Sequence, residues 1–161
     1  MKLKKLLILL CLPIIAACSR ADKAFKETAI EAEAEVGAYA QIDSLTAFRL
    51  DSYDIRENDG NKELIITYSI RSKADPISTS FDLYRLKAQQ EGIDLVPSLD
   101  LVDEEKLVAT LGEDGEIGGL SQGFILKDDS PVDILVKGTD TAFIKDSKPV
   151  EPYPVKITIK P

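Results

Sequence analysis

From residue 45 onward, apolar and polar side chains alternate with a period of two residues. This alternation is the strongest constraint on the fold. In the stretch 64–70, LIITYSI, every even-numbered residue is large and apolar. In 155–160, VKITIK, the odd-numbered residues are apolar and the even-numbered ones polar. Because successive side chains of a strand point to opposite faces, both stretches predict half-buried strands of an antiparallel sheet. The outward lysines of 155–160 further indicate an edge strand.

The stretch 47–56 also has the composition of a strand, but its apolar positions change parity part of the way along. They are even-numbered up to Leu50 and odd-numbered from Tyr53 onward. A one-residue slip of this kind sends later side chains to the opposite face unless an extra residue is accommodated. The slip therefore predicts a β-bulge near Asp51 and Ser52, or else two short strands.

Turn-forming residues separate the expected strands. Asn58-Asp59-Gly60-Asn61 contains the Asp-Gly pair that short hairpins favour, so a tight turn is expected there. The remaining expected strands are 79–88, 93–96, 122–127 and 132–137, and the breaks around them are Asp75-Pro76, Glu91-Gly92, Pro97 and 128–131. The polar stretch 98–119 is expected to be a long connection, with one edge strand or a short helical turn as alternatives within it.

About seven strands divided by turn signals are typical of an immunoglobulin-like antiparallel β-sandwich. We therefore predict an all-β domain over residues 45–161. The Cys…Trp…Cys pattern of antibody domains is absent from this chain, so only the broader architecture is predicted. A small closed barrel is the alternative.

The amino terminus has the three-part organisation of a secretory signal: lysines within residues 2–5, an uncharged run over 6–17, and small residues before a cysteine. The last four residues, Ile15-Ala16-Ala17-Cys18, resemble the lipobox of bacterial lipoproteins. The resemblance implies diacylglyceryl modification of Cys18 and cleavage between Ala17 and Cys18. An ordinary signal peptidase site is the alternative, but it would place the bulky Ile15 at the −3 position.

The apolar run is too short to remain as a membrane span. Residues 6–17 would extend about 18 Å as a helix, against a hydrocarbon core of about 30 Å. Two acyl chains on one cysteine, in contrast, anchor a protein stably. We therefore expect a signal peptide over 1–17, a lipidated amino terminus and tether over 18–44, and a location on the extracytoplasmic face of the cell membrane.

The segment 21–40 is rich in Ala, Glu and Lys, which are strong helix formers. Its narrow apolar stripe, with Phe25, Ile30, Val36 and Tyr39 as the large residues, allows two arrangements. The segment is either a helical or fraying tether, or a helix packed on the domain. A weakly ordered tether is the expectation.

Composition excludes several classes of function. Loss of residues 1–17 removes three of the 20 basic residues and none of the 28 acidic ones, so the mature net charge is −11. This charge argues against nucleic acid as a partner and against electrostatic adhesion to anionic lipid. The chain has no histidine, and Cys11 lies in the removed signal, so imidazole and thiolate catalysis are excluded and no disulfide can form. We expect no cofactor and no enzymatic activity.

Three stretches of the domain resemble an uncharacterised immunoglobulin-like lipoprotein domain family of Gram-positive bacteria, a domain of unknown function. They are LIITYSIRSKADP (64–76), FDLYRLKAQQEGIDL (81–95) and SQGFILKDDSPVDILV (121–136). The last is the most distinctive, because members place Lys-Asp-x-Ser-Pro-Val between two apolar strands. The resemblance implies a fold and a location, but no activity.

Two groups of acidic residues are candidates for a binding or catalytic site. The stretch Asp94–Glu116 is dense in carboxylates but does not match a calcium-binding loop, so solvated side chains are expected. Asp128 and Asp129 could form half of a carboxylate pair for glycoside hydrolysis, but a turn-capping role fits a Ser-Pro turn better. The predicted function is binding of a protein or envelope component. A carboxylate-based cell-wall glycan hydrolase and a structural spacer are the alternatives.

Overall fold

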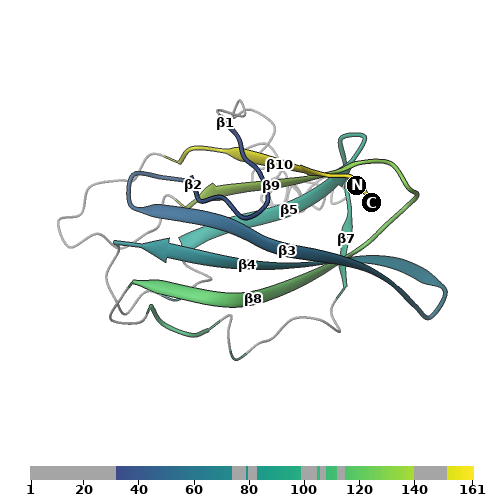
Figure 1. The fold of residues 1–161 in the computed structure, drawn as a ribbon, viewed down its shortest axis with the longest axis horizontal. Helices are drawn as coiled ribbons and strands as arrows, with labels where there is room; N and C mark the ends of the chain where they lie inside the picture. The colour runs from purple at the N-terminus through teal and green to yellow at the C-terminus, as the bar shows by residue number, and fades with distance from the viewer. Residues whose placement is uncertain are drawn as a thin grey trace, which may run out of the picture.

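The structure, a computed structural model, describes residues 32–73, 79, 83–98, 105, 108–111, 115–139 and 152–161. Within these ranges ten strands form two five-stranded sheets (Figure 1). None of the described residues belong to a helix long and apolar enough to cross a bilayer. The all-β prediction is confirmed.

Each sheet combines three longer strands with short strands at its edges. Sheet A has the order β1 (Ala32–Glu33), β10 (Val155–Ile159), β9 (Val132–Gly138), β5 (Tyr84–Gln90) and β6 (Ile93–Asp94). Sheet B has the order β2 (Ala40–Gln41), β3 (Thr46–Asn58), β4 (Asn61–Ser72), β8 (Glu116–Ile125) and β7 (Val96–Ser98). Strands β1 and β10 pair in parallel, and the other paired neighbours are antiparallel.

The inner faces of the two sheets enclose one hydrophobic core. Phe48 of β3 stacks on Tyr68 of β4 with ring centroids 5.3 Å apart, and Tyr84 of β5 meets Tyr68 edge-on at 5.7 Å. The hydroxyl groups of Tyr68 and Tyr84 share a hydrogen bond of 2.6 Å between the sheets. Such a bond satisfies two polar groups that are buried in an apolar interior. Aromatic side chains of the two sheets therefore pack against one another in the core.

The longest hairpin follows the sequence pattern closely. The register of β3 against β4 shifts between Leu50 and Ser52, which confirms the predicted bulge. The hairpin turn is Asp59-Gly60, with φ of 47° and 78°. Two consecutive positive φ angles are the requirement of a type I′ turn, whose twist matches that of the flanking strands. All four even-numbered residues of 64–70 are fully buried, as the alternation predicts.

The count of ten strands exceeds the expected seven because short segments join the sheet edges. The expected strand 93–96 is divided in two: β6 belongs to sheet A and β7 to sheet B, with the buried Leu95 between them. Pro97 was expected to end this strand but lies within β7. An outermost strand tolerates proline because one side of its backbone needs no partner.

Two strand boundaries and one edge assignment also differ from expectation. Strand β8 begins at Glu116, so Gly118 and Gly119 belong to a strand and not to the long connection expected over 98–119. A register shift against β4 occurs beside them, and Gly119 adopts a φ of 68°. Strand β5 begins at Tyr84 instead of residue 79. Strand β10 is not the outermost strand along its whole length, because β1 pairs with its first two residues.

Residues 32–44, here named the strap, contradict the expectation of a helical or weakly ordered tether. The strap contributes β1 to sheet A and β2 to sheet B, and Ile42 is fully buried. The carbonyl oxygen of Ile42 accepts hydrogen bonds from the backbone N–H groups of Gly138 and Tyr153, each 2.8 Å long. Strand pairing and burial of Ile42 outweigh the helical propensity of the local sequence. Cys18 and residues 18–31 lie outside the described residues, and the predicted domain limits stay a prediction.

Candidate functional site

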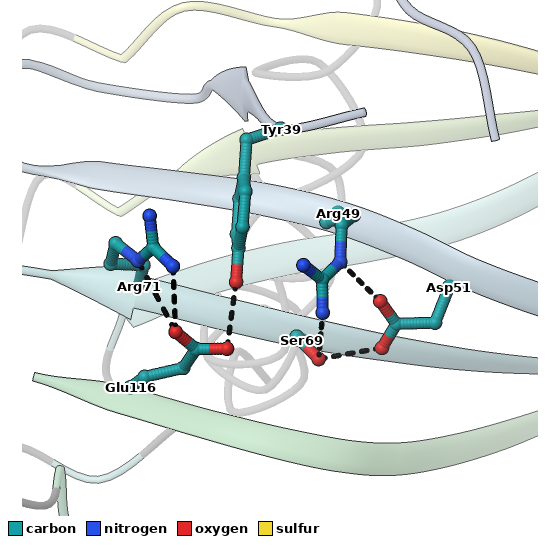
Figure 2. Close-up of polar contacts among 6 residues, drawn as sticks. All are labelled: Tyr39, Arg49, Asp51, Ser69, Arg71 and Glu116. Atoms are coloured by element: carbon teal, nitrogen blue, oxygen red, sulfur yellow. Dashed lines mark hydrogen bonds and ion pairs between the residues drawn. The ribbon is translucent and has the colours of Figure 1, made fainter. Parts of the chain in front are cut away.

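The strap carries Tyr39 onto the outer face of sheet B, where it meets side chains from three strands (Figure 2). We name this group the Tyr–Arg cluster. Its members are Tyr39 of the strap, Arg49 and Asp51 of β3, Ser69 and Arg71 of β4, and Glu116 of β8. Residues separated by up to 77 positions in the sequence are thereby in direct contact.

Tyr39 lies between two guanidinium groups. The Cζ atom of Arg49 is 4.5 Å from the centroid of the Tyr39 ring, and that of Arg71 is 4.4 Å away. A guanidinium within about 6 Å of an aromatic centroid is attracted by the negative face of the ring. The Tyr39 hydroxyl donates a 2.9 Å hydrogen bond to Oε1 of Glu116. The ring is thus held on its faces and at its tip.

The two arginines are each held by a carboxylate. Arg71 donates from Nε and Nη2 to Oε2 of Glu116, at 3.2 and 2.9 Å. Arg49 donates from Nε to Oδ1 of Asp51, whose Oδ2 accepts a 2.5 Å hydrogen bond from the Ser69 hydroxyl. Charge-assisted hydrogen bonds of this kind fix side-chain orientation more strongly than neutral ones. The side chains of the cluster are therefore held by contacts with one another.

Strand register explains why these residues meet. Arg49 lies directly opposite Ser69, and Arg71 lies directly opposite Glu116. Residues directly opposite in an antiparallel pair share one face of the sheet. Asp51 is the additional residue of the bulge between Leu50 and Ser52, and its carboxylate contacts Arg49 on the outer face. The bulge that the sequence predicts thus brings one of the two acidic members to the cluster.

The ionisation states suit recognition better than proton transfer. Hydrogen bonds from Arg71 and Tyr39 lower the pKa of Glu116. Burial, together with the Glu116 carboxylate, raises the pKa of Tyr39. Near neutral pH Glu116 is therefore charged, Tyr39 is a neutral donor, and two arginines balance two carboxylates. A general acid or base works best with a pKa near the operating pH, and these groups are shifted away from it.

The cluster is accessible from outside. The side chain of Arg71 is 56% exposed, and those of Arg49 and Glu116 are 31% and 27% exposed. Tyrosine and arginine are enriched among the residues that dominate protein interfaces. An open hollow of about 640 Å³ adjoins Tyr39, lined by strap residues and Tyr153. The arrangement offers an ordered surface on which a partner can bind.

The sequence-predicted site residues that the structure describes are not brought together. Ala17 and Cys18 lie outside the described residues, as do Asp100, Asp103, Glu104, Glu113 and Asp114 of the acidic stretch. Of the remainder, Glu105 is exposed, Asp94 accepts hydrogen bonds from Lys87 (2.9 Å) and Gln89 (2.5 Å), and Glu116 belongs to the Tyr–Arg cluster. The described parts of the chain contain no group of three or more acidic side chains arranged for a metal ion.

Asp128 and Asp129 take part in the architecture of the β8–β9 turn. Oδ1 of Asp128 accepts the backbone N–H of Ser130 at 2.8 Å, which is the capping interaction expected of this turn. Asp129 forms an ion pair with Lys62 of β4. The two carboxylates therefore have separate structural partners.

Sequence reasoning missed two residues that organise these regions. Gln90 is 2% exposed, and its Nε2 donates to the carbonyl oxygens of Asp128 and Ser130 at 3.1 and 2.9 Å. Its Oε1 accepts the backbone N–H of Lys127 at 2.8 Å. The other is Tyr39, which was grouped with the apolar residues of a helix. No local pattern links either residue to its distant contacts, although a glutamine on the apolar face of a strand was a signal for Gln90.

No protein-family model matches the chain, and no curated protein matches it. Among solved structures, the chain is similar to the crystal structure of ycdA, a candidate lipoprotein of Bacillus subtilis subsp. subtilis str. 168. The TM-score is 0.51, with 11% sequence identity over 74% of this chain and 38% of that chain. It is also similar to a candidate lipoprotein of Staphylococcus aureus subsp. aureus NCTC 8325, with a TM-score of 0.47 and 14% identity over 76% of this chain and 93% of the other.

The chain spans 38% of the length of ycdA, so the likeness concerns one part of that protein. At 11% identity it supports a shared fold. Both structural neighbours are described as candidate lipoproteins. The expected assignment to an immunoglobulin-like lipoprotein family stays a prediction.

Proposed function

We propose that this protein is a lipid-anchored, extracytoplasmic interaction domain that binds a protein or envelope component through the outer face of sheet B. The proposal includes an immunoglobulin-like fold for this domain. The observation that carries the proposal is the Arg71–Tyr39–Arg49 stack, in which both cations and the ring are held by neighbouring side chains. Pre-ordered tyrosine and arginine side chains lose little conformational entropy when a partner binds.

The predicted anchor places this surface close to the membrane. Fourteen residue steps separate Cys18 from Ala32, where sheet A begins. A fully extended chain covers at most about 3.6 Å per residue, so Ala32, where the domain begins, lies within about 50 Å of the acylated cysteine. Partners are therefore expected among components of the membrane and of the adjoining envelope. The lipoprotein descriptions of the two structural neighbours agree with this location.

A photo-cross-linking amino acid at Ser52, an exposed outer-face position beside the Tyr–Arg cluster, tests the proposal in intact cells. We expect one saturable cross-linked product that is lost when Arg71→Ala is added. The matched control is Lys62→Ala, which also removes one cation but lies in the hairpin, on the other side of Ser52 from Arg71. A product that persists in the Arg71→Ala variant, or that fails to saturate, contradicts the proposal. Absence of any product favours a spacer.

A carboxylate-based glycan hydrolase is the alternative from a different class, and Asp128 and Asp129 are its candidate acids. Hydrogen bonding to Ser130 lowers the pKa of Asp128, which suits a turn cap better than a proton donor. Asp128→Asn and Asp129→Asn are expected to alter thermal stability and leave partner cross-linking intact. Release of soluble glycan from purified cell wall by the parent protein, abolished in these variants without a change in melting temperature, favours the hydrolase.

A further inference from the structure

Basic side chains gather on the outer face of sheet A. The outward-facing residues of its three central strands include Arg85 and Lys87 of β5, Lys137 of β9 and Lys156 of β10. Asp133 of β9 is the single carboxylate among the outward-facing residues that the structure describes on these same strands. We name these four cations and their surroundings the basic face. It lies on a mature chain whose net charge is −11.

The centre of the basic face is a row across three strands. Lys156 lies opposite Leu135, and Leu135 lies opposite Lys87. Leu135 is only 9% exposed although it points outward. Long lysine stems cover apolar surface while their ammonium groups reach toward water. The row therefore presents ammonium groups over an apolar base.

Among the described residues, two carboxylates that pair with these cations lie on the edge strands of sheet A. Lys87 pairs with Asp94 of β6 at 2.9 Å, and Lys156 pairs with Glu33 of β1 at 2.8 Å. Asp94 and Glu33 are 53% and 76% exposed, so water weakens both pairs. A row of cations flanked by exposed edge carboxylates can exchange these partners for a flat anionic surface.

The chain leading from the predicted anchor enters the fold at the edge of this same sheet. Strand β1 is the first described element, and it lies beside β10 along the margin of sheet A (Figure 1). The segment that leads toward Cys18 therefore leaves from the sheet that carries the basic face. The Tyr–Arg cluster lies on the outer face of the other sheet.

We propose that the basic face lies against the anionic headgroups of the membrane that holds the lipid anchor. This inference rests on the proposed lipid anchoring, which keeps the domain within reach of those headgroups. Lysine and arginine side chains near an anionic leaflet are attracted individually, within about one Debye length of roughly 10 Å. The negative net charge of the whole chain argues against adhesion to anionic lipid. It does not describe the local charge of the basic face. In the proposed orientation sheet B points away from the membrane and exposes the Tyr–Arg cluster to partners.

Fluorescent labelling of the full lipidated protein tests the orientation, because the mature chain has no cysteine other than Cys18. The label is placed at Thr158→Cys on the outer face of sheet A, or at Ser52→Cys on the outer face of sheet B. Vesicles carry a headgroup-linked quencher in phosphatidylcholine, with or without phosphatidylglycerol. We expect stronger quenching at position 158 than at 52 with phosphatidylglycerol. The difference should be lost without it and at about 1 M salt, where the Debye length is about 3 Å.

Charge-neutralising variants separate the basic face from general charge effects. Lys87→Gln with Lys156→Gln should abolish the difference between the two labels. The matched control, Arg56→Gln with Lys62→Gln, removes two cations from the β3–β4 hairpin and should leave it intact. Equal quenching at both positions overturns the proposal. If the label at position 158 is shielded from solvent in cells but not on anionic vesicles, the membrane proposal is also overturned. The basic face then binds an acidic protein. Failure of the protein to float with any vesicle contradicts the anchoring itself.

Discussion

The outer faces of the two sheets distribute their charges differently. On sheet B, Arg49 and Arg71 are paired with carboxylates inside the face and are joined through Tyr39. On sheet A, cations occupy the central strands and their partners Glu33 and Asp94 lie on the edge strands. Internal pairing produces an ordered, neutral surface suited to a shaped partner. Separation of charge across the strands produces a surface suited to a flat anionic one.

The strap joins the two sheets. A substitution at its junction with sheet A should destabilise the fold more than the other changes considered below. A Cβ atom on Gly138 would overlap the carboxylate of Asp43, which is 1% exposed. We expect Gly138→Ala to lower the free energy of unfolding by about 3 kcal/mol, the upper range for overpacking. Chemical denaturation measures the loss. The matched control is Gly118→Ala in sheet B, where the added Cβ would lie 3.3 Å from Ser69 Oγ and the loss should be much smaller. Equal losses would show that the junction is not special.

Tyr39→Ala removes the centre of the Tyr–Arg cluster. Loss of two cation–π contacts and of a hydrogen bond to a carboxylate should cost about 1–2 kcal/mol of unfolding free energy. Faster amide hydrogen exchange over residues 37–41 should accompany the loss. Tyr39→Phe retains the ring between Arg49 and Arg71 and should lose less. If the two variants behave alike, the stacking contributes nothing beyond the hydroxyl.

The two carboxylates Asp43 and Glu116 should respond to pH in opposite directions. Burial raises the pKa of Asp43 above its ordinary 3.8, so stability should fall as pH rises from about 3.8 through the folded pKa. Arg71 and Tyr39 lower the pKa of Glu116 below its ordinary 4.5, so its contribution is present above pH 4.5 and is lost as pH falls through the folded pKa. Denaturation of Asp43→Asn and Glu116→Gln over pH 3–7 should remove each dependence separately. For each variant, the difference in unfolding free energy from the parent is plotted against pH. If both differences change with pH in the same direction, the opposite pKa shifts of Asp43 and Glu116 are contradicted.

The smallest effect on stability is expected on the basic face. Lys87→Gln with Lys156→Gln removes two partly exposed ion pairs, which typically contribute little. The denaturation midpoint should stay within experimental error of the parent, while membrane orientation is lost. A clear drop in the denaturation midpoint would show that these lysines stabilise the fold. The difference between the two faces would then be smaller.

The amount that could be predicted differs between local and distant features. The bulge after Leu50, the Asp59-Gly60 turn and the buried even-numbered residues of 64–70 follow from periodicity and turn chemistry within a few residues. The strap was mispredicted, because helical propensity of an Ala- and Glu-rich segment is weaker than the pairing and burial that a sheet edge offers. Tyr39 was assigned to that segment, so the candidate site was missed.

Sequence patterns alone predict that the chain forms β-sheets, which side of the stretches 64–70 and 155–159 faces inward, and where the longest hairpin turns. Side-chain alternation and turn preferences are properties of neighbouring residues, so they can be seen without a structure. The outward side chains that share a face depend on strand order, which these local patterns do not reveal. Strand order brings Tyr39 to Arg71 and Glu116, and it gathers Lys87 and Lys156 from strands remote in sequence. Charge summed along the chain contains no such information, because the field at a surface depends on which strands are neighbours.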